Sequence, residues 1–200
     1  MLIVDIKTGS DFGMYDILQA NAYGKLYETE SKNSSDYKIN FFEKEHKYII
    51  NGIHIPSVTT VLNCLIPDAA KKLDAAKMGS RIHKLCNYMD MGILDGKKIR
   101  ENEKGFLQAW KKFNEKYKLK NTSKIIEKRL FSEKHQFCGT IDYQYPEIFD
   151  HIEVWDVYIS EDGNFSEKIR YNQSSSDKAF NYFLCFLSVW NIQNNRVKLK

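Results

Sequence analysis

The chain has few cysteines, no long apolar run and little net charge. No C-x-x-C pair occurs among its four cysteines, which are Cys64, Cys86, Cys138 and Cys185. This spacing argues against a zinc ribbon or an iron–sulfur cluster, and we interpret all four as ordinary thiols. No apolar run is long enough to span a bilayer, and the first residues lack a basic-then-apolar signal pattern. These absences predict a cytoplasmic protein without a membrane partner.

The composition is that of a globular protein. The 200 residues are 42% apolar and 28% charged, which suits one domain with a real hydrophobic core. Thirty basic and 26 acidic residues leave a net charge of +4. That charge is too small to identify a partner, although it permits nucleic acid. We therefore predict a single domain over residues 1–200.

Apolar spacing and turn residues predict an α+β protein in which helices pack on a central mixed sheet. The polar segment 31–36 is the best candidate for a linker, and Asn51-Gly52 predicts a tight hairpin turn. Ser57 and Asp68 are candidate helix caps. Strands are expected at 2–7, 38–42, 47–50, 53–55, 125–131, 137–143, 154–159 and 165–171, and helices at 15–30, 57–65, 68–92, 101–117 and 176–191.

Two polar pairs near the start of the chain can each share a face. Asp5 and Lys7 are two residues apart in an expected strand, so their side chains point to the same side and could serve one metal-bound phosphate. Gln19 and Tyr23 are one helical turn apart. Taken alone, the first pair also fits a solvated strand face, and the second fits a surface hydrogen bond.

Two carboxylates flank the polar turn expected at 132–136. If that turn is tight, Glu127 and Asp142 face each other on adjacent antiparallel strands. Facing carboxylates repel each other unless a cation lies between them. The alternative is that Asp142 ends its strand while Glu127 pairs with Lys128 or Arg129.

His83 lies beside the apolar stripe of the helix expected at 68–92, where it can face a cleft. A lone helix histidine is also commonly a half-buried structural residue.

Together these motifs resemble those of RecB-type PD-(D/E)XK nucleases, and the resemblance covers nearly the whole chain. The matching segments are Val4-Asp5-Ile6-Lys7-Thr8-Gly9, Gln19-x-x-x-Tyr23, the segment 126–131 with Glu127, Cys138-Gly139-Thr140-Ile141-Asp142 and Gly79-Ser80-Arg81-Ile82-His83. The segments 46–48 and 55–62 are similar to the opening of small phage-type members, and the segment from Val154 to Asn191 resembles their C-terminal end.

The order of the motifs differs from that family. In the relatives the Asp-x-Lys strand and the Gln-x-x-x-Tyr helix follow the histidine helix and the Gly-Thr-Ile-Asp strand, whereas here they occupy residues 1–31, ahead of the remainder at 38–200. A permuted connectivity can rebuild the same site, whereas a rearranged or artificially joined reading frame need not. Because elements pack by contact rather than by chain order, we expect preserved geometry, with strand 2–7 beside strand 137–143.

The resemblance implies a restriction-endonuclease-like core and a divalent-metal-dependent deoxyribonuclease, an exonuclease of phage or mobile-element type. Its cofactor would be Mg²⁺ or Mn²⁺, with no iron–sulfur cluster. The metal would be held by Asp5, the carbonyl of Ile6, His83 and Asp142. Lys7 would orient the attacking water. Glu127 would be an outer or second-metal carboxylate, and Gln19 and Tyr23 would contact the nucleic-acid backbone.

The same resemblance implies linear DNA with free ends as the partner, and it leaves open a homo-oligomer or a partner protein of recombination or replication. Two other functions remain open: a catalytically inactive DNA-binding relative, and a PD-(D/E)XK endonuclease acting on branched or specific DNA. Candidate phosphate contacts, each equally consistent with a solvated helix face, are Arg81, Lys71, Lys72, Lys77 and Lys84.

Overall fold

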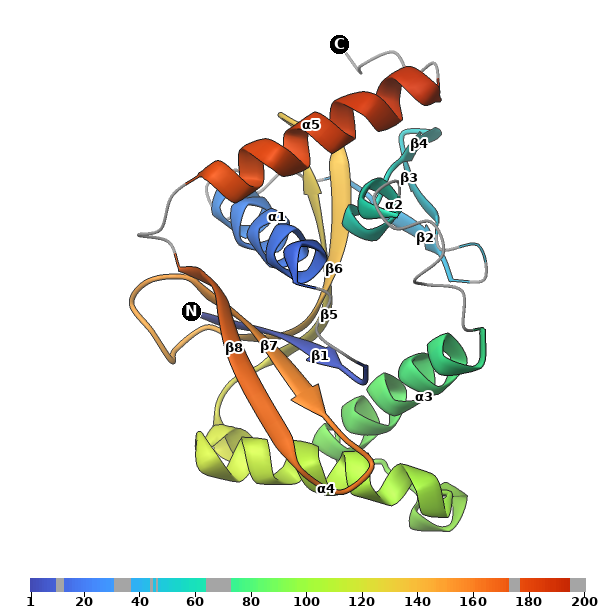
Figure 1. Ribbon diagram of the computed structural model, residues 1–200, viewed down its shortest axis with the longest axis vertical. Helices are drawn as coiled ribbons and strands as arrows, with labels where there is room; N and C mark the ends of the chain where they lie inside the picture. The colour runs from blue at the N-terminus through green and yellow to red at the C-terminus, as the bar shows by residue number, and fades with distance from the viewer. Residues whose placement is uncertain are drawn as a thin grey trace.

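The computed structural model describes residues 1–9, 13–30, 37–43, 45, 47–63, 73–172 and 177–194. The expected linker 31–36, Cys64, Asp68, Lys71, Lys72 and His46 therefore lie outside the described residues. The chain forms an α+β fold with a mixed five-stranded sheet flanked by helices (Figure 1).

The first strand of the chain lies in the middle of this sheet. The strand order is β5-β6-β1-β7-β8, formed by β1 (Leu2–Lys7), β5 (Ile125–Ser132), β6 (Phe137–Tyr145), β7 (Glu153–Ile159) and β8 (Phe165–Asn172). Strand β1 runs antiparallel to β6 and parallel to β7. The prediction that strand 2–7 pairs with strand 137–143 is confirmed. Its apolar side chains explain the position, because Leu2, Ile3, Val4 and Ile6 are all buried.

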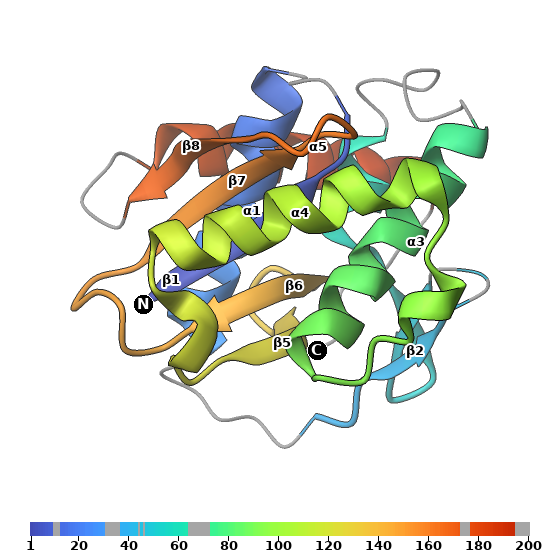
Figure 2. The same cartoon turned by 90° about the horizontal axis from the view of Figure 1, so that it is seen from below.

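Helices cover both faces of the sheet. On one face α1 (Met14–Glu30) lies between the sheet and α5 (Lys178–Gln193), with α2 (Val58–Leu62) beside them (Figure 1). On the other face lie α3 (Leu73–Asp90) and α4 (Glu101–Lys116), as Figure 2 shows. Because side chains alternate along β1, Ile3 joins the core under α1 while Val4 and Ile6 join the core under α3 and α4. Asp5 and Lys7 consequently share the α1 face.

A small second sheet closes one side of the molecule. Strands β2 (Asn40–Phe42), β3 (Lys47–Ile50) and β4 (Ile53–Ile55) pair in the order β2-β3-β4. It packs on the main sheet through Tyr48 and Ile50, which share an apolar cluster with Phe131 and Cys138. Short 3-10 turns occupy Gly96–Lys98 and Leu119–Asn121.

Several helix ends differ from expectation by a few residues. Helix α2 begins where predicted, because the Ser57 hydroxyl accepts a hydrogen bond from the Thr60 N–H at 3.0 Å. It ends at Leu62 rather than at residue 65. Helix α5 begins at Lys178 and extends two residues beyond the expected end, to Gln193, because Phe183, Leu187 and Trp190 keep it packed on α1 and α2. No helix in the described part of the chain combines the length and apolar character needed to cross a bilayer.

Candidate metal and nucleic-acid site

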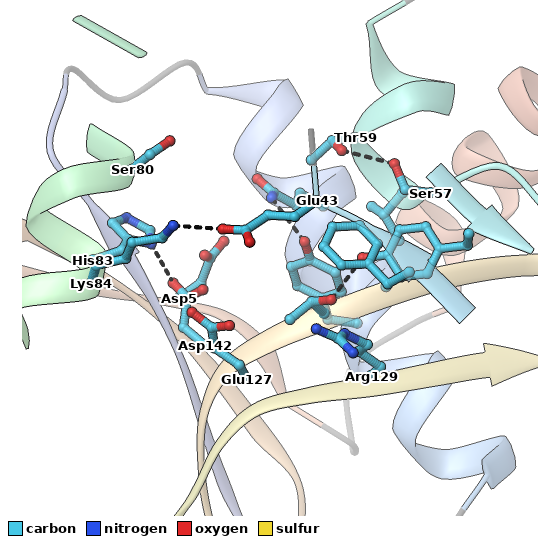
Figure 3. A pocket seen from close by; sticks show the side chains of 17 residues that line it. Asp5, Glu43, Ser57, Thr59, Ser80, His83, Lys84, Glu127, Arg129 and Asp142 are labelled. Carbon is cyan, nitrogen blue, oxygen red and sulfur yellow. Dashed lines mark hydrogen bonds and ion pairs between the residues drawn. The ribbon is translucent and has the colours of Figure 1, made fainter. Parts of the chain in front are cut away.

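A pocket of about 400 Å³ lies where β1, β5 and β6 meet α1, α3 and the small sheet (Figure 3). It brings together candidate residues from distant parts of the sequence. Of these, Asp5, Gln19, Tyr23, His83, Lys84, Glu127 and Asp142 line it.

Strand pairing places Asp5 against Asp142. The β1–β6 pairing ends with Val4 opposite Tyr143, so Asp5 and Asp142 are next in register. The Ile6 N–H then donates a hydrogen bond to Asp142 Oδ2 at 2.9 Å instead of continuing the ladder. The two carboxyl groups are close enough for the charge of Asp142 to raise the pKa of Asp5. The β1–β6 pairing thus ends at the pocket, which both acids line.

Glu127 faces the same acid from β5. The flanking pairs Ile126 with Tyr143 and Lys128 with Ile141 put Glu127 opposite Asp142, as the turn argument predicted. Glu127 has a φ of 52°, a left-handed conformation that is costly for a residue with a side chain and is often found at functional sites. Its Oε1 accepts a hydrogen bond from Asn87 Nδ2 at 2.8 Å. Glu127 is therefore held at the pocket edge by α3.

Lys7 is held by acids and an amide on the α1 face. Its Nζ lies 2.8 Å from Asp5 Oδ2 and 3.5 Å from Asp16 Oδ1, and it donates to Gln19 Oε1 at 2.7 Å. Gln19 in turn donates to the Tyr23 hydroxyl at 3.2 Å. Although burial lowers the pKa of Lys7, the carboxylates of Asp5, Asp156 and Asp16 raise it above its ordinary value. The ammonium group is thus charged and fixed in place.

His83 approaches Asp142 from α3. Its Nδ1 lies 3.4 Å from Asp142 Oδ2. Burial lowers the pKa of His83, but the nearby Asp142 carboxylate outweighs burial and the net shift is upward. The histidine expected to face a cleft does so.

The two central acids have opposite pKa shifts. Burial raises the pKa of Asp5 to about 7, with Asp142 and Asp156 adding to the rise and Lys7 opposing it. Burial also raises the pKa of Asp142, but His83 and the Ile6 N–H outweigh it and the net shift is downward. Of the two acids, Asp5 is therefore the one that holds a proton more readily.

The donor set fits a hard divalent cation. Two aspartates, a glutamate and an imidazole converge, and Asp5 Oδ2 is buried without a well-formed hydrogen bond despite the nearby Lys7 ammonium. Within the described residues no three His, Cys, Asp or Glu side chains are already grouped as a metal site. Asp5 is paired with Lys7 instead, and Asp142 with His83.

A second polar cluster, which the sequence reasoning missed, lies behind Lys7. Asp16 and Asp156 are buried, and the Tyr158 hydroxyl donates to Asp16 Oδ2 at 2.9 Å. Arg170 Nε donates to Asp156 Oδ2 at 2.9 Å. The parallel register pairs Asp5 with Asp156, which puts their side chains on the same face of the sheet. The only sequence signal was Asp156, the one charged residue in the segment 154–159.

The three lysine and arginine candidates on α3 have different environments. Arg81 does not line the pocket: it forms a bidentate ion pair with the fully buried Glu103 of α4 and donates to the Lys98 carbonyl at 2.9 Å. Arg81 thus has a structural role, because it compensates a buried charge, and its contact with phosphate stays a prediction. Lys84 lines the pocket and pairs with Glu43 at 2.5 Å. Lys77 is exposed and does not line it.

Gly139 of the Gly-Thr-Ile-Asp segment lets α1 approach β6. A Cβ atom there would lie 2.9 Å from Cε1 of Tyr23 and 3.0 Å from Cδ2 of Leu26. We expect Gly139→Ala to lower the free energy of unfolding by about 1–3 kcal/mol, the usual cost of overpacking a core. Denaturant titration would measure this. Gly96→Ala is the matched control because its Cβ would meet nothing within 4 Å, and an equal loss in both variants would contradict the packing argument.

Comparisons of the chain with models of known families, with curated proteins and with solved structures found no match. Interpretation of the site therefore depends on its own geometry.

Proposed function

We propose that this protein is a divalent-metal-dependent DNA nuclease with a permuted PD-(D/E)XK core, acting as an exonuclease. One observation carries the proposal. One pocket is lined by residues from the start of the chain and from much later segments, namely Asp5, Gln19, His83, Glu127 and Asp142. Lys7, also from the start of the chain, contacts this lining through Gln19. A site spoiled by the changed motif order would not keep this convergence, which disfavours the inactive relative.

Each side chain has a role that its contacts support. Mg²⁺ or Mn²⁺ would be held by Asp5, Asp142, His83 and the Ile6 carbonyl, and Glu127 would be an outer or second-metal carboxylate. Such a cation, when bound, polarises the scissile phosphate and lowers the pKa of a water molecule. Lys7 carries a fixed positive charge beside Asp5, where it can orient that water and stabilise charge that develops on the phosphate.

Gln19 is a positioning residue in this proposal. Its amide oxygen accepts from Lys7 and its amide nitrogen donates to Tyr23, so the amide fixes the ammonium group relative to helix α1. The Tyr23 ring packs against Gly139 on β6, and this contact fixes the hydroxyl to which Gln19 donates. The water-orienting group and the carboxylates are thereby held by the same two strands and one helix.

The direct test is incubation of the purified protein with end-labelled linear DNA and with closed circular DNA. We expect degradation of the linear substrate with Mn²⁺ or Mg²⁺ and none in excess EDTA, because the acids need the cation to bring phosphate close. Cleavage that persists in EDTA would refute the metal mechanism. Circles that stay intact support the exonuclease, whereas nicked or cut circles support the endonuclease.

A further inference from the structure

The pocket has a second wall that the proposed chemistry does not use. Arg129 lies across the pocket from Asp5 and His83 (Figure 3), and Phe41 and Tyr48 of the small sheet also line it. No acid of the candidate metal site belongs to this wall, which we call the aromatic wall and define as Phe41, Tyr48 and Arg129.

The aromatic wall is preassembled. The Arg129 guanidinium carbon lies 4.8 Å from the centroid of the Phe41 ring, and Phe41 packs on Tyr48 with ring centroids 4.7 Å apart. Tyr48 is fixed by a 2.6 Å hydrogen bond that its hydroxyl shares with Thr140 of β6. Arg129 is exposed and forms no ion pair among the described residues. Its N–H groups are therefore available to an anion.

The aromatic wall lies close to the acids. Arg129 follows Glu127 by two residues on β5, and both side chains line the pocket. A phosphate held among the carboxylates by a cation would then have its neighbouring nucleotide beside Arg129. Planar guanidinium and aromatic groups offer such a nucleotide a phosphate contact and a surface for base stacking.

We infer that the aromatic wall binds an unpaired nucleotide next to the scissile phosphate, so that the preferred substrate is single-stranded DNA or a duplex end with a single-stranded overhang. This inference rests on the proposed nuclease function for the position of the cut. Stacking on the wall requires a free base face, whereas a base within a duplex has both faces covered and costs a few kcal/mol to extract.

The test compares binding of a fluorescently labelled single-stranded oligonucleotide and a blunt hairpin of equal length, by fluorescence anisotropy in EDTA. The variants are Phe41→Leu, which keeps an apolar side chain but removes the aromatic face, and Arg129→Lys, which keeps the charge but removes the planar group. We expect each to weaken binding of the single strand about tenfold, the scale of one stacked base, and to change hairpin binding much less.

Two neighbours provide matched controls. Phe42→Leu changes the adjacent aromatic residue on β2, which is exposed and does not line the pocket. Lys128→Arg changes the basic neighbour on β5, whose ammonium lies over the Tyr27 ring instead. Both controls should bind like the wild type. A Phe41→Trp variant adds an independent readout, because its fluorescence should be quenched by the single strand and not by the hairpin, while Trp110, Trp155 and Trp190 are buried.

The outcomes separate this inference from the nuclease proposal. If the chain cuts no DNA but Phe41→Leu and Arg129→Lys selectively lose the single strand, the nuclease proposal fails and the aromatic wall stands. If the wild type cuts DNA with Mn²⁺ but the variants match their controls, or lose both ligands equally, the inference is overturned. Undetectable binding of the single strand by the wild type would also overturn it.

Discussion

The Asp142→Asn variant is expected to lose divalent-cation binding and DNA cleavage together, with cleavage reduced about 10³-fold or more. Asparagine keeps an oxygen that can accept from the Ile6 N–H, so the β1–β6 contact survives while the charge is removed. His83 and the Ile6 N–H lower the pKa of the Asp142 carboxyl and so keep it ionised in the pocket. Calorimetric titration with Mn²⁺, beside the end-labelled DNA assay, measures both losses.

Lys7→Ala separates the lysine from the metal ligands. Removing the ammonium group should leave Mn²⁺ affinity unchanged or slightly higher, because a competing cation beside Asp5 disappears. Turnover should fall about 10²–10³-fold, the scale for one electrostatic group. Asp95→Asn is the matched control for Asp142→Asn, because it also removes a carboxylate. Asp95 is exposed, and asparagine can still cap the short helical turn at Gly96–Lys98. If Lys7→Ala lost Mn²⁺ as severely as Asp142→Asn, the assigned roles would be wrong.

The part of the site that local spacing determines could be predicted from the sequence. Alternation along one strand put Asp5 and Lys7 on one face, and the polar turn after β5 fixed the register that sets Glu127 opposite Asp142. The apolar character of β1 explained why it takes a central position in the sheet despite its place in the chain. Each of these follows from a few neighbouring residues.

Contacts between distant elements could not be predicted in the same way. Arg81 looked like a free basic residue on a helix, because nothing local shows that the fully buried Glu103, on another helix, needs a cation. The cluster around Asp16 and Asp156 joins α1 to β7 and β8, and the aromatic wall depends on how the small sheet docks. Sequence spacing carries no information on such docking.

The buried cluster behind Lys7 gives the site more acidic than basic groups. Asp5, Asp16 and Asp156 surround Lys7 and Arg170, so acids exceed bases in a region with little access to water. Burial raises the pKa of Asp156 as it does that of Asp5. An excess of buried acids is costly without a further positive charge, and a proton or a divalent cation can supply it.

Competition between the proton and the cation predicts that Mn²⁺ affinity depends strongly on pH. The pKa of Asp5 is raised to about 7 and that of His83 lies above its ordinary value, so below pH 7 both groups hold protons that a cation must displace. Asp142, whose pKa is lowered, stays ionised throughout this range. The apparent affinity should therefore rise with pH and level off once both groups are deprotonated, changing about tenfold per pH unit for each proton displaced.

Calorimetric titration of the metal-free protein with Mn²⁺ between pH 5.5 and 8.5, in buffers of different ionisation enthalpy, measures both the affinity and the number of protons released. We expect release of more than one proton near the acidic end, where Asp5 and His83 are both protonated, and almost none at the alkaline end. His83→Asn should reduce the release without abolishing it, because the Asp5 proton remains to be displaced. A Mn²⁺ affinity that is constant across this range would show that the protonated acid and histidine are not where the cation binds.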